Sequence, residues 1–225
     1  MSPSDPKRFE EAIRHLAQDG FLAYPTETVW GLGACADRAD AVERLMSWKG
    51  REEGAPLAVL VPSVAVAEEW GCTLSDAAQR LAAAFWPGPL MLVVPCRQTF
   101  ATGVAGDQGA LGLRCSSHPV AQALAQGVSE AGLGPLTSTS LNRTGQPPAA
   151  NRDEAQAVLS AGLWPPDRAE PRWVFEASYA SETAGEDEAG GALPSTVVDC
   201  TGAEAKILRV GAIAASEIEE SSRRK

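Results

Sequence analysis

A ten-residue stretch near the start of the chain, Tyr24–Gly33, carries side chains that could contact a ligand. Its sequence is Tyr-Pro-Thr-Glu-Thr-Val-Trp-Gly-Leu-Gly, and it follows an apolar run that begins at Phe21. Pro25 has no N–H group and cannot continue a central strand, whereas Gly31 and Gly33 let the backbone turn or approach another group closely. A strand that ends in hydroxyl, carboxylate and glycine residues is typical of α/β ligand sites. A tight structural loop with incidental polar residues would have the same pattern.

Four apolar segments of the chain, the stretch at 24–33 among them, carry hydroxyl or cationic residues at one end. These residues are Thr26, Thr28, Arg114, Ser138, Ser140, Asn142, Ser195 and Thr196, and the additional cations are Lys49, Arg51 and Arg209. Each segment alone indicates little, because Ser and Thr are ordinary strand-end residues. Several cations and neutral donors with few carboxylates suit a polyanionic ligand such as a nucleoside triphosphate. Together the segments predict a phosphate or nucleotide site.

Lys49 is one of four lysines in a chain with fifteen arginines, and it lies two residues before Arg51. This placement indicates that an ammonium group is needed at position 49. Chance would also explain it, as would a favourable interaction with the helix dipole worth about 0.3–1 kcal/mol. The chain has no G-x-x-x-x-G-K-[ST], no G-x-G-x-x-G and no G-x-S-x-G motif. His118 precedes a proline and is predicted to be a structural or helix-capping residue rather than a general base. Catalysis would therefore depend on positioning and charge stabilisation.

Composition limits the class of protein. The 225 residues carry a formal net charge of −10 with a pI near 4.7, which opposes non-specific binding to nucleic acid or an anionic membrane. The five cysteines form no C-x-x-C and there are two histidines, so a structural zinc site is not expected. We expect a cytoplasmic protein with reduced core cysteines, without a signal peptide or a membrane span.

Alternating short strands and helices predict a single α/β domain over residues 1–215. Residues 178–191 are acidic and rich in small residues, which predicts a mobile loop, and residues 216–225 are expected to form a frayed polar tail. The predicted helices span 6–20, 39–48, 64–70, 75–85, 119–130 and 153–160. The predicted strands span 21–24, 57–61, 90–95, 111–115, 194–199 and 206–211, with one more from 135 and a short edge strand at 173–175.

Ordered motifs along most of the chain resemble those of the YrdC-like family, and within it the L-threonylcarbamoyladenylate synthases of the TsaC type. After the stretch at 24–33 come Lys-Gly-Arg, Pro-Leu-Ala-Val-Leu-Val, Trp-Pro-Gly-Pro-Leu, Gly-Leu-Arg, Thr-Ser-Leu-Asn-Arg-Thr-Gly, Pro-Ser-Thr-Val-Val-Asp and Ile-Leu-Arg-Val-Gly. The resemblance runs from about Gly20 to Gly211, which leaves no room for the additional C-terminal domain of longer relatives. It implies a twisted mixed sheet with helices packed around a wide concave cavity.

The resemblance also implies a nucleotidyltransferase that makes threonylcarbamoyl-AMP and pyrophosphate from L-threonine, bicarbonate and ATP. Other proteins then transfer the threonylcarbamoyl group to tRNA, so weak or no direct tRNA binding is expected. Mg²⁺ would accompany ATP without direct protein ligands. The family motifs assign Thr28, Arg114, Ser138 and Ser195 to threonine. They assign Lys49, Arg51, Ser140, Asn142 and Arg209 to ATP, with Lys49 and Arg51 as the catalytic cations, unless Asn142 only fixes its loop.

Four positions depart from the family pattern: Ala55 stands where relatives often have Lys or Asn, Leu60 where some have His, Leu141 where Ala is commoner, and Trp30 where Tyr is usual. They leave two alternatives open. One is a related enzyme that adenylates a carbamate from another substrate. The other is an RNA-binding module with the same fold, which the acidic charge argues against.

Overall fold

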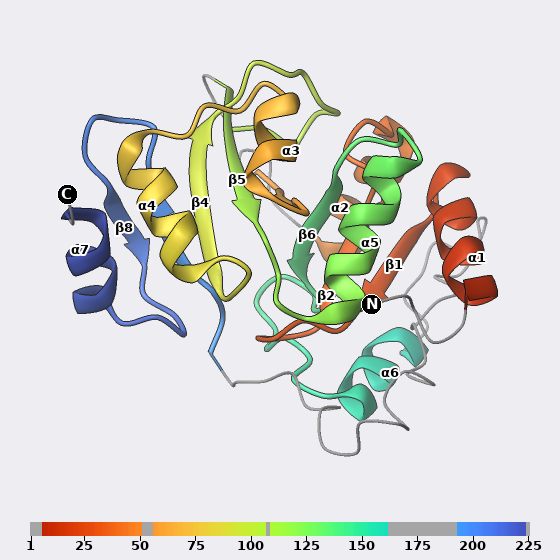
Figure 1. Ribbon diagram of the computed structural model, residues 1–225. Coiled ribbons are helices and arrows are strands. Elements are labelled where there is room, and N and C mark those ends of the chain that lie inside the picture. Colours follow the sequence, from red (N-terminus) through yellow and green to blue (C-terminus); the bar gives the residue numbers. More distant parts are fainter. Residues whose placement is uncertain (1–5, 51–55, 107–108, 162–192, 224–225) are drawn as a thin grey trace.

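One sheet of eight strands organises the described part of the chain (Figure 1). The computed structural model describes residues 6–50, 56–106, 109–161 and 193–223. The sheet order is β1-β2-β6-β3-β5-β4-β7-β8, and only the pairs β3–β5 and β4–β7 are parallel among these strands. The strands are β1 (Phe21–Tyr24), β2 (Gly31–Ala34), β3 (Ala58–Leu60), β4 (Leu90–Pro95), β5 (Ala110–Arg114), β6 (Leu136–Ser140), β7 (Thr196–Asp199) and β8 (Lys206–Arg209). This mixed sheet confirms the predicted α/β class.

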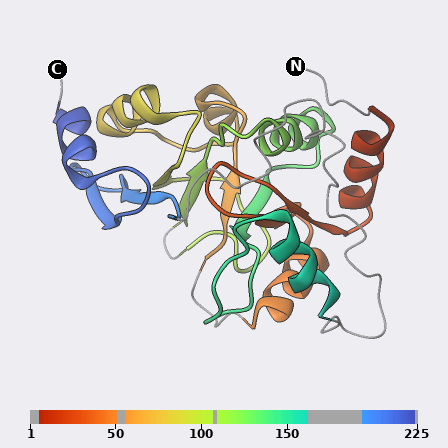
Figure 2. The same ribbon diagram turned by 90° about the horizontal axis from the view of Figure 1, so that it is seen from below.

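Seven helices accompany the sheet in the described ranges, and they lie on both sides of it (Figure 2). They are α1 (Pro6–Ala17), α2 (Ala39–Lys49), α3 (Val64–Glu69), α4 (Asp76–Phe85), α5 (Pro119–Glu130), α6 (Arg152–Ser160) and α7 (Ala215–Arg223). Buried apolar residues of α1 and α5 pack with strand residues such as Leu22 and Leu136. A second cluster joins α2 and α4 to the opposite side chains of the strands, including Leu92 and Leu113. None of the helices that the structure describes is long and apolar enough to cross a bilayer.

Strand β2 was not predicted, because its sequence Gly-Leu-Gly-Ala resembles a turn. It pairs antiparallel with β1 on one side and with β6 on the other. A Cβ atom on Gly33 would lie 2.1 Å from the carbonyl oxygen of Thr137, and one on Gly31 would lie 2.6 Å from the Tyr24 ring. The glycines are therefore needed because β2 packs closely against its neighbours, and they do not mark a turn of the chain. Tyr24 is fully buried, and burial raises its pKa to about 12.

Gly33→Ala is expected to destabilise the fold by about 2 kcal/mol, because the added methyl group meets a backbone atom that cannot rotate away. For a chain of this size the thermal midpoint should fall by about 4–8 °C, which differential scanning calorimetry can measure. Gly202→Ala is the matched control, since a Cβ there would have no neighbour within 4 Å. Equal midpoints for the two variants would contradict the packing role of Gly33.

The C-terminal segment differs from its prediction. Residues 216–223 form most of α7 instead of a frayed tail, because Ile218 is buried at 1% exposure and Arg80 on α4 donates two hydrogen bonds to the Ser222 carbonyl oxygen (3.0 and 2.8 Å). The predicted loop at 178–191 and strand at 173–175 lie outside the described residues.

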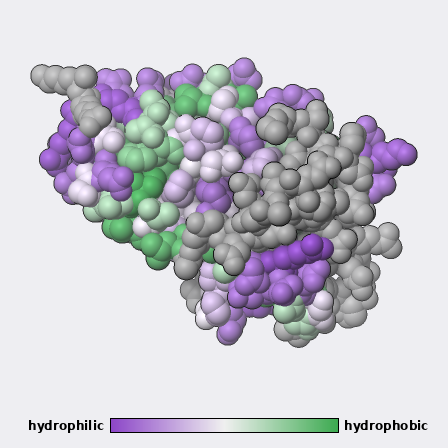
Figure 3. Space-filling view, turned by 60° about the horizontal axis from the view of Figure 1, so that its bottom comes forward, coloured by the Kyte–Doolittle hydropathy of each residue, from purple (hydrophilic) through white to green (hydrophobic). Residues whose placement is uncertain are grey.

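Three large apolar side chains are exposed near the β8 edge of the sheet: Leu193, Leu208 and Val210. Figure 3 shows that apolar residues gather on one side of the face it presents.

Candidate functional site

The strand pairing places the predicted site residues of the strands on one face of the sheet. Directly paired residues point the same way, and the direction alternates along each strand. The pairs that define this face are Ser140 with Gly31, Ser138 with Ala58, Leu60 with Arg114, Arg114 with Met91, Met91 with Val197, and Val197 with Arg209. Helices α1 and α5 pack over the part of this face that carries Leu22 and Leu60. The remaining part, toward Ser138 and Arg209, stays open to a ligand.

A cavity of about 390 Å³ lies over this open part of the sheet, a volume in the usual range for small-molecule sites. It brings together six residues that the sequence assigned to a site. They are Thr28, Arg114, Ser138, Ser140, Ser195 and Arg209. Trp30 also lines the cavity and is 2% exposed.

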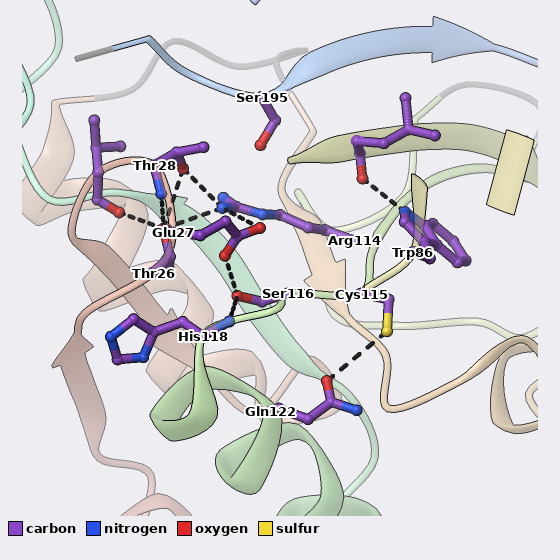
Figure 4. Close-up of polar contacts among 12 residues, drawn as sticks. Thr26, Glu27, Thr28, Trp86, Arg114, Cys115, Ser116, His118, Gln122 and Ser195 are labelled. Carbon is purple, nitrogen blue, oxygen red and sulfur yellow. Dashed lines mark hydrogen bonds and ion pairs between the residues drawn. The ribbon is translucent and has the colours of Figure 1, made fainter. Parts of the chain in front are cut away.

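Arg114 is the central cation of the cavity and is held by the loop between β1 and β2. Its Nη2 donates to the hydroxyl oxygens of Thr28 (2.7 Å) and Thr26 (3.0 Å), and it lies 3.2 Å from Glu27 Oε1. Figure 4 shows these groups gathered at one end of the guanidinium. Thr26 in turn donates to the Val29 carbonyl oxygen (2.7 Å), which fixes the loop. These contacts all go to Nη2, and Nε has no hydrogen-bond partner among the described residues, so this second donor remains for a ligand.

Glu27 is a functional neighbour that the sequence did not identify. Its second carboxylate oxygen accepts a hydrogen bond from the Ser116 hydroxyl, and the same hydroxyl accepts from the backbone N–H of His118 (3.2 Å). His118 Nδ1 accepts from the Val120 N–H at the start of α5 (3.2 Å), so the predicted capping role of this histidine is confirmed. The acid thus fixes the position of Arg114, and no feature of the sequence pairs residues 27 and 114.

Three buried polar atoms of cavity-lining residues have no hydrogen-bond partner among the residues described. They are Arg114 Nε, Trp30 Nε1 and Ser195 Oγ. In Figure 4 the Ser195 hydroxyl is directed toward Arg114 with no dashed line to it. A buried polar atom left unpaired costs about 1–3 kcal/mol. These atoms therefore mark where a ligand with hydrogen-bond acceptors would be stabilised.

A second cation, Arg209, extends the positive part of the cavity toward β8. Its guanidinium donates to the Ser195 carbonyl oxygen through Nη2 (2.9 Å) and Nε (3.3 Å). Burial, followed by the charge of Arg114, lowers the pKa of Arg209 below its usual range. Two guanidinium groups that repel each other in this way favour a ligand with more than one negative charge.

Lys49 lies behind the cavity wall rather than on it. Its buried ammonium donates to the carbonyl oxygens of Ser140 (2.5 Å) and Asn142 (2.9 Å) and to Asn142 Oδ1 (3.2 Å). Asn142 also accepts from the Ser140 hydroxyl (2.6 Å) and donates to the Gln146 carbonyl oxygen (2.6 Å). Lys49 and Asn142 thus fix the loop after β6, the alternative already named for Asn142. Arg51 and Ala55 lie outside the described residues.

The arrangement can bind a carboxylate at Arg114 and further anionic groups near Arg209, with neutral hydroxyl donors between them. No group of three or more His, Cys, Asp or Glu side chains that could hold a metal ion occurs within residues 6–50, 56–106, 109–161 and 193–223. The guanidinium and hydroxyl donors of the cavity therefore suit an anionic ligand.

Comparison with known proteins supports a relation to one family. A family model described as Telomere recombination, for Sua5, YciO and YrdC, matches residues 14–163. A putative threonylcarbamoyl-AMP synthase of Mycobacterium tuberculosis is 35% identical over 209 residues, which make up 93% of this chain and 86% of that protein. A threonylcarbamoyl-AMP synthase of Xanthomonas campestris is 37% identical over 156 residues, 68% of this chain and 81% of that protein.

A solved structure shares the fold. The crystal structure of P. abyssi Sua5 complexed with L-threonine superposes with a TM-score of 0.77 at 27% sequence identity. The match covers 98% of this chain and 58% of the Sua5 chain, so this chain spans just over half of that protein.

Proposed function

The chain belongs to the Sua5, YciO and YrdC family, and we propose that it makes threonylcarbamoyl-AMP and pyrophosphate from L-threonine, bicarbonate and ATP. It is a nucleotidyltransferase-type enzyme, as its relatives named threonylcarbamoyl-AMP synthase indicate. The observation that carries the proposal is the position of Arg114, fixed by Thr28 beside the unpaired Ser195 hydroxyl in one cavity. That site offers a guanidinium and neutral donors to an amino acid.

We propose that Arg114 binds the threonine carboxylate, because its Nε donor is buried and has no partner among the described residues. Thr28, Ser138 and Ser195 line the same cavity and would orient the rest of the amino acid. Glu27 already neutralises part of the Arg114 charge through its contact with Nη2. Binding would therefore depend on the direction of the remaining donors as well as on net charge.

We propose that ATP occupies the side of the cavity formed by Ser140 and Arg209. Lys49 would support that side through its hydrogen bonds to Ser140 and Asn142, and Arg51 is proposed to contact the phosphates on the family motif alone. Mg²⁺ is the expected metal ion; it would enter bound to the phosphate oxygens of ATP and shield their charge.

The reaction requires an anionic carbamate and an activated phosphate in one cavity. Threonine and bicarbonate form the carbamate with loss of water, and a carbamate oxygen then attacks the α-phosphorus of ATP. The bond to the bridging oxygen breaks and pyrophosphate leaves with that electron pair. Arg114 and Arg209 would hold the two anions together, so positioning and charge stabilisation supply the catalysis. We propose that the enzyme works in the cytoplasm and passes its product to tRNA-modifying transfer proteins.

Pyrophosphate release tests the proposal. The purified chain should release pyrophosphate from ATP only when L-threonine and bicarbonate are both present. A panel of other amino acids and carbamoyl phosphate in the same assay distinguishes this enzyme from a related one that adenylates another carbamate. The related enzyme would release pyrophosphate with one of these compounds in place of threonine. Release that does not depend on threonine would refute the assignment, and a salt-sensitive complex with tRNA without ATP would favour the RNA-binding alternative.

Ser195→Ala should raise the KM for threonine about fivefold, because it removes one hydrogen bond worth about 1 kcal/mol. Its thermal midpoint should not fall, since the Ser195 hydroxyl has no partner among the described residues. Thr196→Val is the matched control: its hydroxyl donates to the Ile213 carbonyl oxygen (2.7 Å) and accepts from the Gly211 N–H (2.9 Å). That variant should lose stability and keep its KM, and the reverse pattern would contradict these roles.

A further inference from the structure

Two of the five free cysteines are in direct contact. Cys72 and Cys96 have their sulfur atoms 3.0 Å apart, although 24 residues separate them in the chain. Both are largely buried, at 5% and 8% exposure respectively. The cysteine count and spacing gave no sign of this pair, because the two residues meet only through the fold.

The backbone at this pair has the geometry that a disulfide needs. Cys72 and Cys96 form an antiparallel bridge, flanked by hydrogen bonds from Thr73 N–H to the Pro95 carbonyl oxygen (2.8 Å) and from Arg97 N–H to the Gly71 carbonyl oxygen (3.1 Å). The two cysteines are therefore a non-hydrogen-bonded pair, for which the Cα separation is about 4.5 Å. That separation lies within the range of about 4.4–6.8 Å for disulfides.

The two thiols also differ in acidity, as an attacking and a resolving cysteine must. The hydrogen bond from the Cys72 thiol, together with the backbone N–H groups of Gln98 and Arg97, lowers the pKa of Cys96 below its usual range. The same contact and burial raise the pKa of Cys72. Burial instead raises the pKa of Cys115 and of Cys200 to about 11. Because the thiolate is the nucleophile, Cys96 reacts first.

We propose that Cys72 and Cys96 are a site of covalent modification, at which a low-molecular-weight disulfide such as oxidised glutathione is reduced and an intramolecular disulfide is formed. The Cys96 thiolate attacks one glutathione sulfur, the glutathione S–S bond breaks, and one glutathione thiolate leaves. The Cys72 thiol then loses its proton to solvent and its sulfur attacks Cys96 Sγ, which releases the second glutathione thiolate. Two protein thiols are oxidised and one small disulfide is reduced to two thiols.

The bond would join the segment before α4 to the end of β4, away from the candidate cavity. Met91, near the start of β4, lines that cavity, and Cys96 follows five residues later, about 16 Å along an extended strand. Oxidation should therefore raise stability without changing the synthase reaction. The inference rests on the geometry and acidity of the two thiols and would survive failure of the proposed function.

Peptide mapping tests the site. The five cysteines fall in five different tryptic peptides, with Cys72 in residues 52–80 and Cys96 in residues 81–97. The full chain is incubated with oxidised glutathione, blocked with an alkylating reagent and digested without reduction. We expect these two peptides to be joined and the thermal midpoint of the oxidised chain to rise by about 5–10 °C. Stable glutathione adducts on wild-type Cys96, another cysteine pairing, or no oxidation of the folded chain would overturn the proposal.

Single replacements separate the two roles. In Cys72→Ala the glutathione adduct on Cys96 should accumulate, because no second thiol is present to displace it. In Cys96→Ala neither the adduct nor the cross-link should form. Cys200→Ala removes a buried free cysteine elsewhere and should still give the cross-link. Cross-linking in the wild-type chain supports the proposal even where a variant fails to fold, and equal adduct formation at Cys72 and Cys96 would contradict the assigned order.

Discussion

Replacing Lys49 with alanine is expected to lower the turnover number for pyrophosphate release at least about 100-fold, because its buried charge is preorganised behind the proposed phosphate side of the cavity. The ammonium has three N–H donors, and three oxygen atoms of Ser140 and Asn142 accept from it. Its removal takes positive charge away from the proposed phosphate side and frees the loop after β6. Steady-state kinetics with ATP as the varied substrate measures the effect.

The division of the loss between kcat and KM tells which role dominates. A charge that acts only in the transition state lowers kcat and kcat/KM equally, whereas a loosened loop raises the KM for ATP as well. Lys49→Met keeps much of the side-chain volume without the charge and should lose as much turnover as the alanine variant. Lys206→Ala, on exposed β8, is the control and should be unchanged. Normal turnover in Lys49→Ala would show that Lys49 has no role in catalysis.

Arg114→Lys is expected to raise the KM for threonine about 100-fold, equivalent to about 2.7 kcal/mol. An ammonium cannot reproduce the planar fork that pairs with a carboxylate while it also contacts neighbouring acceptors. A single nitrogen, Nη2, contacts Thr26, Thr28 and Glu27. The ammonium of a lysine at this position would bind these groups and leave no donor for the threonine carboxylate. Initial rates over a range of threonine concentrations measure the change, and the KM for ATP should move much less.

A folding control is needed for this variant, because Glu27 is left with a poorer partner in a buried position. The thermal midpoint should be recorded, and Arg80→Lys gives a matched replacement away from the cavity, where Arg80 contacts the Ser222 carbonyl oxygen. Arg80→Lys should leave the KM for threonine unchanged. A folded Arg114→Lys enzyme with a near-normal KM for threonine would show that the carboxylate binds elsewhere.

Much of the fold could be predicted because local signals agreed with it. The limits of β1, β4 and α5 coincide with their predictions, and the helix predicted from residue 75 is capped there, where Ser75 accepts a hydrogen bond from Ala78 N–H. Gly50 ends α2 with a left-handed backbone, with φ of 60°, a conformation that favours glycine. Strand β2 was missed because its glycines look like turn residues. Gly33 is needed only because the Thr137 backbone, distant in the sequence, packs against it. Helix α7 was missed because its one well-buried residue, Ile218, gives too weak a local pattern.

The candidate site could be predicted in its membership but not in its connections. Six of the nine assigned residues line one cavity. Strand pairing carries the four strand residues among them to one face, whereas Thr28 and Ser195 lie in the segments next to the strands. The hydrogen bonds that fix Arg114 and Lys49 join segments 86 to 93 residues apart. Neither spacing nor composition determines such contacts, which is also why Glu27 and the Cys72–Cys96 pair were not foreseen. The roles of all nine residues toward threonine and ATP stay predictions.

The most direct test of the central claim is to identify the product. Isotope-labelled bicarbonate, L-threonine and ATP are incubated with the purified chain, and the nucleotide products are analysed by mass spectrometry. We predict threonylcarbamoyl-AMP that carries the bicarbonate label, formed in step with pyrophosphate, together with a sharp loss of this product in Lys49→Ala and in Arg114→Lys. Pyrophosphate release without a labelled threonine adduct, or an unlabelled product, would contradict the account.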